Sequence, residues 1–234
     1  MDMYLFPSHS QHKLIRLMLK GGVIDENTVF VDFGHECAQF LAHLAIAVRD
    51  RGLSSSHLQK VARNALFLGI EADDLRNYGA LSLLMDLLKR EDEKDHQLPL
   101  RIAVTNASIE DLRHLERVTT VYMFAPVFIE KTLEKIAELV NASSTVQFVI
   151  STFNSAKMAE YGFTGLHQMM LPDDDDEEVS VEAKTVLTMS GGGQKFTFHL
   201  HVRDLPSSGS GQGKRVRNRK RLYIFFKFFF SFQN

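Results

Sequence analysis

The stretch V-F-V-D-F-G-H-E-C-A-Q, residues 29–39, decides the fold of this chain. Three β-favouring residues run directly into Asp32, and Gly34 follows two positions later. Apolar residues then recur at the spacing of one helix face, namely Phe40, Leu41, Leu44, Ala45 and Val48. A strand that breaks at a glycine and turns at once into a helix is how doubly wound α/β folds open a nucleotide or cofactor site. The helix N-terminus supplies free N–H groups there, and glycine lets the backbone approach the ligand.

Strand and helix patterns alternate along the next hundred residues. Strands are expected at residues 29–33, 65–71, 100–104, 120–124 and 145–151. Helices are expected at 10–21, 38–49, 73–89 and 129–140, with a short helix after the serines at 54–56 and a helical turn at 109–115. This alternation predicts a mostly parallel sheet with helices on both faces.

The alternation ends after the fifth strand. Residues 173–178 are all acidic, which is typical of a solvated loop. Two strand patterns follow at 179–189 and 194–202, joined through S-G-G-G at 190–193, and this combination is a hairpin signal. The predicted fold class is therefore α/β: a class I methyltransferase (Rossmann-like), doubly wound, mostly parallel sheet ending in a C-terminal β-hairpin.

Charge divides the chain into an acidic body and a basic tail. The 234 residues include 27 basic and 29 acidic ones. Residues 214–234 hold seven of the basic residues and no acidic one, which leaves 20 basic against 29 acidic residues in the first 213. We predict a helical lead-in at 1–28, a methyltransferase-like domain at 29–205, and a basic, disordered tail at 206–234.

Composition excludes several other classes of protein. The single cysteine, Cys37, excludes an intramolecular disulfide and a CxxC metal site, and it favours a reducing compartment. No run approaches the roughly 18 consecutive apolar residues of a membrane span, so we expect none. The first twenty residues mix basic and apolar side chains, and we expect no signal peptide there.

Residues 12–204 resemble the histone-lysine methyltransferases that lack a SET domain, the disruptor-of-telomeric-silencing family. The first motif of that family reads roughly F-V-D-L-G-S-G-x-G-Q, and residues 30–39 here read F-V-D-F-G-H-E-C-A-Q. The second strand ends in G-I-E, similar to the family's G-V-E or G-I-E. The closing strand, Q-K-F-T-F-H-L-H-V-R-D, resembles the family's last strand and includes its histidine, here His201.

The resemblance implies a cofactor, a substrate class and a set of binding residues. The cofactor is S-adenosyl-L-methionine (SAM), with Asp32, Gly34 and Gln39 shaping the binding loop. Glu71 corresponds to the ribose-binding acid, because a carboxylate at the end of the second strand can accept hydrogen bonds from two adjacent hydroxyls. Asn106 falls where the family binds the adenine amine. The implied activity is lysine methylation on histone in the nucleosome, and the implied location is the nucleus.

The sequence departs from the family pattern at three places, and these keep a second hypothesis open. Glu36 and Ala38 replace the second and third glycines of the first motif. A carboxylate at Glu36 repels the carboxylate of SAM by roughly 4 kcal/mol at about 4 Å and an effective dielectric near 20. Ala107 replaces an aromatic residue, and F-A-P-V-F at 124–128 lacks the family's asparagine. The alternative is a catalytically inactive methyltransferase-fold protein that serves as a chromatin or protein-binding module. No catalytic residue is predicted.

Four other side chains are candidates for a functional role. Cys37 lies at a predicted helix N-terminus, but it has no base partner in the sequence pattern and is read as a small turn residue. His35 is read either as a ligand contact or as an exposed side chain. His199 and His201 alternate with Phe198 and should point away from its apolar face. An H-x-H metal site needs further ligands, which the sequence does not supply, so no metal site is predicted.

The tail carries two distinct segments. The cluster K-R-V-R-N-R-K-R at 214–221 can act as a nuclear-import signal or make nonspecific, salt-sensitive contacts with nucleic-acid phosphates, and a solubilising tail is the alternative. Residues 222–234 are rich in phenylalanine. They are interpreted as an interfacial membrane contact, a partner-binding peptide, or a stretch foreign to the natural chain, with the last favoured. Oligomeric state is not predicted.

Overall fold

The centre of the protein is an eight-stranded sheet. The structure, a computed structural model, describes residues 8–53, 56–92, 98–173, 180–188 and 193–204. The sheet has the order β3-β2-β1-β4-β5-β10-β6, and β9 also pairs with β10. Its strands are β1 (Val29–Phe33), β2 (Leu66–Glu71), β3 (Ile102–Asn106), β4 (Thr120–Met123), β5 (Phe148–Ser151), β6 (Leu166–Gln168), β9 (Lys184–Thr188) and β10 (Lys195–Arg203).

Strands β1 to β5 are parallel, and β10 is antiparallel to its neighbours β5, β6 and β9. The chain moves outward from β1 through β2 to β3, then returns to the other side of β1 and continues with β4 and β5. This reversal places a topological switch point at the carboxyl ends of β1 and β4, which is where open α/β sheets bind ligands. The predicted doubly wound sheet is confirmed.

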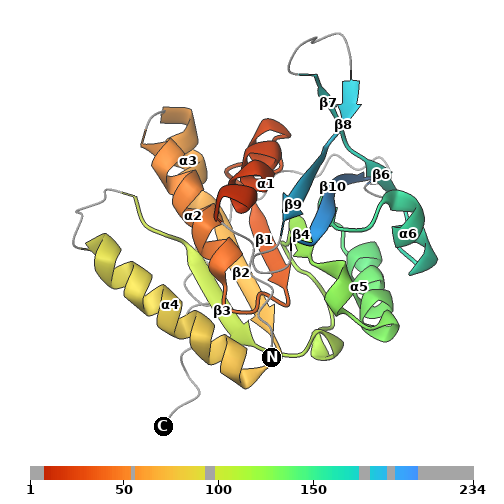
Figure 1. Cartoon of the computed structure of the whole chain (residues 1–234), viewed down its shortest axis with the longest axis horizontal. Helices are drawn as coiled ribbons and strands as arrows, with labels where there is room; N and C mark the ends of the chain where they lie inside the picture. The colour runs from red at the N-terminus through yellow and green to blue at the C-terminus, as the bar shows by residue number, and fades with distance from the viewer. Residues whose placement is uncertain (1–7, 54–55, 93–97, 174–179, 189–192, 205–234) are drawn as a thin grey trace, which may run out of the picture.

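Helices cover both faces of the sheet. They are α1 (Ser8–Lys20), α2 (Gln39–Gly52), α3 (Ser56–Asn64), α4 (Asp74–Asp92), α5 (Glu130–Ala142) and α6 (Ser155–Glu160), with short 3-10 turns η1 (Ile109–Asp111) and η2 (Ala125–Val127). Because side chains alternate along a strand, Phe30 belongs to one apolar core with α1, α2 and α3, and Val31 belongs to a second core with α5. Figure 1 shows α1, α2 and α3 close together, with α5 apart from them.

The C-terminal hairpin is confirmed as the antiparallel pair β9–β10, but its first strand is interrupted. The predicted strand at 179–189 is split at Ala183 into β8 (Ser180–Glu182) and β9. The first half pairs with β7 (Met170–Pro172) in a separate two-stranded sheet, which projects from the body in Figure 1. Most of the acidic run at 173–178 and residues 206–234 lie outside the described residues.

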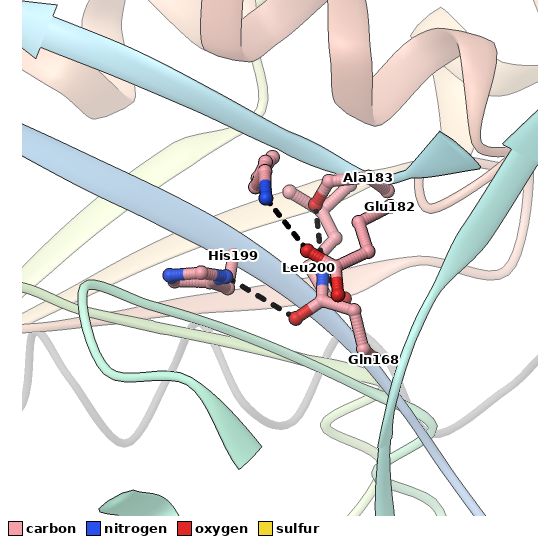
Figure 2. A network of polar contacts seen from close by, with 6 residues as sticks. Gln168, Glu182, Ala183, His199 and Leu200 are labelled. Atoms are coloured by element: carbon pink, nitrogen blue, oxygen red, sulfur yellow. Dashed lines mark hydrogen bonds and ion pairs between the residues drawn. The ribbon is translucent and has the colours of Figure 1, made fainter. Parts of the chain in front are cut away.

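A polar network fastens this split (Figure 2). The side-chain amide of Gln168 donates to Ala183 O at 3.1 Å, and Leu200 N donates to the same oxygen at 2.9 Å. The amide oxygen of Gln168 therefore faces His199 Nδ1, 3.2 Å away, and His199 Nδ1 is the donor. One glutamine thus connects β6, β10 and the break between β8 and β9.

No helix among the described residues is long and apolar enough to cross a membrane. Helix α1 contributes Leu14, Ile15 and Met18 to the same core as Phe30. The boundary at residue 28, between the helical lead-in and the methyltransferase-like domain, stays a prediction.

Candidate functional site

The loop between β1 and α2 has an unusual backbone. Gly34, Glu36 and Ala38 have φ angles of 69°, 52° and 56°. For a residue with a side chain this left-handed region costs roughly 1–2 kcal/mol, so glycine normally occupies it. Glu36 and Ala38 stand at the positions of the second and third motif glycines. The loop therefore has a glycine-type backbone at two positions that carry side chains.

Helix α2 begins at this loop without a side-chain cap. Its N-cap residue, Ala38, makes no side-chain hydrogen bond. The first N–H groups of a helix have no partner within the helix, so they are left to solvent or a ligand here. Such N–H groups, together with the helix dipole, form an anion-binding position.

Glu71 does not line the cavity, and its carboxylate instead holds backbone groups behind the loop. Its Oε2 accepts a hydrogen bond from Glu36 N at 3.1 Å, and its Oε1 accepts one from Asp73 N at 3.0 Å. The side chain is almost fully buried. Glu71 therefore fixes the loop to the end of β2. A carboxylate has about four lone-pair positions, so two remain for ribose hydroxyls.

His35 is buried, which excludes the exposed interpretation. The ring lies against Gly69 of β2, where an added Cβ would come within 2.8 Å of His35 Cγ and 2.7 Å of Leu41 Cδ1. Both ring nitrogens lack a hydrogen-bond partner among the described residues. Burial lowers the pKa of His35, and this effect outweighs the opposite influence of Glu71. A neutral imidazole with two unsatisfied nitrogens thus forms part of the crevice.

Three carboxyl groups make the crevice acidic. Burial, followed by repulsion from Glu36 and Glu71, raises the pKa of Asp32 well above its ordinary value. Burial also raises the pKa of Glu36, and Arg76 acts in the opposite direction. A cationic ligand group would relieve this repulsion.

The cavity at the loop is small. Its volume is about 50 Å³, whereas pockets for drug-sized ligands are on the order of 300–1,000 Å³. This volume is too small for SAM, and His35 and Glu36 are among the residues that line it. Loop, helix and strand residues line the cavity: Gln11, Asp32, Gly34, His35, Glu36, Cys37, Gln39, Phe40, Tyr122, Phe124 and Val127.

The predicted binding residues separate into three groups. Asp32, Gly34 and Gln39 line the cavity, and the Oε1 atom of Gln39 is buried without a partner among the described residues. Glu71 contacts the loop from behind. Asn106 is exposed at the end of β3, where its side-chain amide donates to the carboxylate of Asp74. Asn106 neighbours Glu71 in the β2–β3 register but does not line the cavity.

Aromatic side chains that the sequence pattern does not predict form one side of the cavity. Phe40 stacks on Tyr122 with ring centroids 4.6 Å apart, and Phe124 lines the same cavity. Tyr122 is opposite Asp32 in the β1–β4 register. Burial, followed by Asp32 and Glu36, raises the pKa of Tyr122 well above its ordinary value. Only the strand order could have placed Tyr122 beside Asp32.

The remaining candidates from the sequence are Cys37, His199 and His201, and none of them is set up as a reactive group. Burial and Glu36 raise the pKa of Cys37, the opposite of what a reactive thiolate requires. His199 and His201 point away from the Phe198 face as predicted, but His201 is completely buried. Its ring contacts Ser155 Oγ at 3.1 Å and Phe153 O at 2.9 Å. No group of three or more His, Cys, Asp or Glu within the described ranges is placed to hold a metal ion.

Comparison with known proteins identifies the fold. No protein-family model matches the chain, and no curated protein sequence matches it. The magnesium protoporphyrin IX methyltransferase of Synechocystis PCC 6803, solved with bound SAM, is similar with a TM-score of 0.54 and 12% identity, over 84% of this chain and 79% of that one. TrmN from Thermus thermophilus has a TM-score of 0.50 and 8% identity, over 82% of this chain and 48% of that one.

These similarities confirm the predicted class I methyltransferase fold. At such low identity they carry information about the fold alone, and the resemblance to the disruptor-of-telomeric-silencing family stays a prediction.

Proposed function

We propose that this chain binds SAM at the carboxyl ends of β1 and β2. The observation that carries the proposal is the left-handed backbone at Glu36 and Ala38. Neither residue favours that conformation, and both stand where the resembling family has cofactor-loop glycines. A loop that keeps this shape against its own side-chain preferences is best explained by a ligand that needs the shape.

The donor and acceptor groups of the crevice suit such a ligand. Asp32, Glu36 and Glu71 favour the cationic ammonium and sulfonium groups of SAM, and the buried Oε1 of Gln39 offers a further acceptor. Bound SAM would supply an electrophilic methyl group. The aromatic side chains of Phe40 and Tyr122 would exclude water from the crevice. Binding requires the cavity of about 50 Å³ to widen.

The finer proposal is that a histone lysine in the nucleosome is the methyl acceptor and that the protein acts in the nucleus. The sequence resemblance supports this substrate, and the acidic body suits a basic histone segment. The basic cluster at 214–221 would contact nucleosomal DNA phosphates nonspecifically. The protein would contribute proximity and exclusion of water to a neutral lysine amine.

A second candidate function is that of an inactive methyltransferase-fold module that binds chromatin or protein. The small cavity favours it, because a volume of about 50 Å³ does not accommodate SAM. The run at 124–128 adds to this, since η2 contains Pro126 and Val127 where the resembling family has an asparagine-containing segment.

Calorimetric titration of the full chain with SAM and S-adenosylhomocysteine tests the proposal. We expect binding, and we expect Glu71→Ala to weaken it because the loop loses its anchor at Glu36 N. The matched control is Glu134→Ala, an exposed acid on α5, which should bind as the unaltered chain does. If neither ligand binds at millimolar concentration, the cofactor proposal fails and the second candidate stands. Methyl transfer to reconstituted nucleosomes then tests the finer proposal.

A further inference from the structure

The cavity at the loop between β1 and α2 has acidic groups in its wall and no basic side chain beside them. Asp32 and Glu36 both line it, and the lining, as far as the described residues form it, contains no lysine or arginine. The positive charge of Arg76 on α4 acts to lower the pKa of Glu36, but burial outweighs it, and Arg76 does not line the cavity. A charged ligand in this cavity therefore meets carboxyl groups at close range.

The N-terminus of α2 offsets only part of this negative charge. A helix N-terminus is equivalent to roughly half a positive charge, against a full negative charge on each ionised carboxyl group. Burial, followed by repulsion from neighbouring carboxyl groups, raises the pKa of Asp32, and burial also raises that of Glu36. A cation at this place would favour the ionised forms of both acids, whereas a neutral group would not.

Two further features of the cavity point to a ligand and to its charge. His35 is almost fully buried in the lining, and neither of its ring nitrogens has a hydrogen-bond partner among the described residues. Phe40, Tyr122 and Phe124 line the same cavity. Aromatic rings attract cations, and cation sites such as those for quaternary ammonium groups are built from them. Rings and carboxyl groups together therefore suit a cation that leaves water.

The proposed cofactor exists in two forms that differ in this charge. SAM carries a positive sulfonium, and S-adenosylhomocysteine has a neutral thioether in its place. Their ammonium, carboxylate and adenosine groups are identical. The repulsion between Glu36 and the ligand carboxylate is therefore common to both forms and cancels in the ratio of their affinities.

We propose that this crevice selects the sulfonium over the neutral thioether and that Glu36 is the residue that sets this selectivity; the inference rests on the proposed SAM site. Glu36 has this role because it is half-buried, whereas nearly complete burial opposes the charge of Asp32 more strongly. The protein then retains SAM and releases S-adenosylhomocysteine readily, so the demethylated product competes weakly with the cofactor.

Calorimetric titration of the full chain with three ligands tests the selectivity. They are SAM, S-adenosylhomocysteine and sinefungin, an analogue in which a carbon with a protonated amine replaces the methylated sulfur. We expect SAM and sinefungin to bind at least roughly tenfold more tightly than S-adenosylhomocysteine, which corresponds to about 1.4 kcal/mol. Glu36→Gln removes the charge and keeps the side-chain length, so it should reduce this ratio. The matched control is Glu134→Gln, at an exposed acid on α5, which should keep the ratio.

The outcomes separate this inference from the cofactor proposal. Equal affinity for SAM and S-adenosylhomocysteine overturns the selectivity and leaves the SAM site standing. Sinefungin that binds as weakly as S-adenosylhomocysteine also overturns it, because the methyl group and not the charge is then recognised. An unchanged ratio in Glu36→Gln, with urea unfolding showing a folded variant, overturns the role of Glu36. If none of the three ligands binds at millimolar concentration, the cofactor proposal and this inference both fail.

Discussion

At Glu36, in the loop between β1 and α2, the backbone favours a ligand site and the side chain disfavours one. Its φ of 52° and the hydrogen bond from its N–H to Glu71 are compatible with the proposed cofactor loop. Its carboxyl group is half-buried beside Asp32 and Glu71 and is a poor neighbour for the carboxylate of SAM. The conformation therefore supports a ligand site, while the side chain limits its affinity.

Glu36→Gly should raise the free energy of unfolding by about 1 kcal/mol, because it removes left-handed strain and one of three crowded carboxyl groups. Urea unfolding at neutral pH measures the change. Glu36→Gln is the matched control, since it removes the charge and keeps the backbone strain, so it should stabilise less. A glycine variant less stable than the unaltered chain would show that the Glu36 side chain supports the loop.

The burial of His201 predicts a stability loss in acid. Burial lowers the pKa of His201 from 6.5 to about 4. Between these values the unfolded chain binds a proton that the folded chain does not, so folding stability falls as pH drops from 6.5 to 4. The folding stability lost over this range amounts to about 3 kcal/mol, and all of it is present above pH 6.5.

Urea unfolding of the unaltered chain and of His201→Gln, at a series of pH values, measures this loss of folding stability. The variant should show a flatter profile between pH 6.5 and 4. His114→Gln, which removes a largely exposed imidazole, is the control. Identical slopes for the unaltered chain and His201→Gln would contradict the assignment.

Strand β2 and the loop between β1 and α2 pack against each other at one glycine, Gly69. Gly69→Ala would press a methyl group against the His35 ring and Leu41, and it should destabilise the protein by about 1–3 kcal/mol. His35→Ala makes room for that methyl group. In a double-mutant cycle by urea unfolding, the combined variant should therefore lose less stability than the sum of the single losses. Additive losses would mean that the ring does not lie on Gly69.

The end of helix α5 depends on a residue from a distant strand. Arg203 of β10 donates to Asn141 O at 2.7 Å and Ser143 O at 2.6 Å, which are carbonyls at the C-terminal end of α5. A buried cation there compensates the negative end of the helix dipole.

Arg203→Lys should cost about 2 kcal/mol of stability, because an ammonium cannot reproduce the planar fork that reaches both carbonyls. Urea unfolding gives the total, and amide hydrogen exchange should show the loss concentrated in the last turn of α5. Arg113→Lys, at an exposed position, is the matched control. Equal stability of the two variants would contradict the capping role.

Element prediction succeeded where an apolar run ends at a clear signal, and it failed at an edge strand and at very short elements. Strand β1 was predicted with its observed bounds, since its apolar run meets a glycine. The edge strand β3 was displaced by two residues, because apolar pattern does not fix where an edge strand ends. The helical turn expected at 109–115 ends at Asp111, and α6, β6 and β7 were missed because three to six residues carry little periodicity.

The same limit applies to the candidate site. Asp32, Gly34 and Gln39 were found because the motif that contains them is contiguous in sequence. Tyr122 and Phe124 were missed because they reach the cavity only through the pairing of β4 with β1. The burial of His35 depends on the bare face of Gly69, a contact between segments that no local pattern reports.

In the whole molecule, the fold supports the proposed cofactor site and the charge distribution supports the proposed partner. The reversal of strand order beside β1 places the acidic crevice at the switch point of the sheet. The basic cluster at 214–221 supplies the opposite charge elsewhere in the chain. The proposed nucleosomal partner, which has both basic protein segments and phosphates, would match this division of charge.

We propose that the loop at 34–39 is a SAM site that widens on binding. Backbone amide chemical shifts of the full chain, recorded during titration with SAM, test it most directly. We predict saturable changes centred on residues 34–39 and the end of β2 at Glu71, larger in Glu36→Gly at the same SAM concentration. Unchanged shifts at 34–39 in millimolar SAM, or changes confined to other parts of the chain, would contradict the claim.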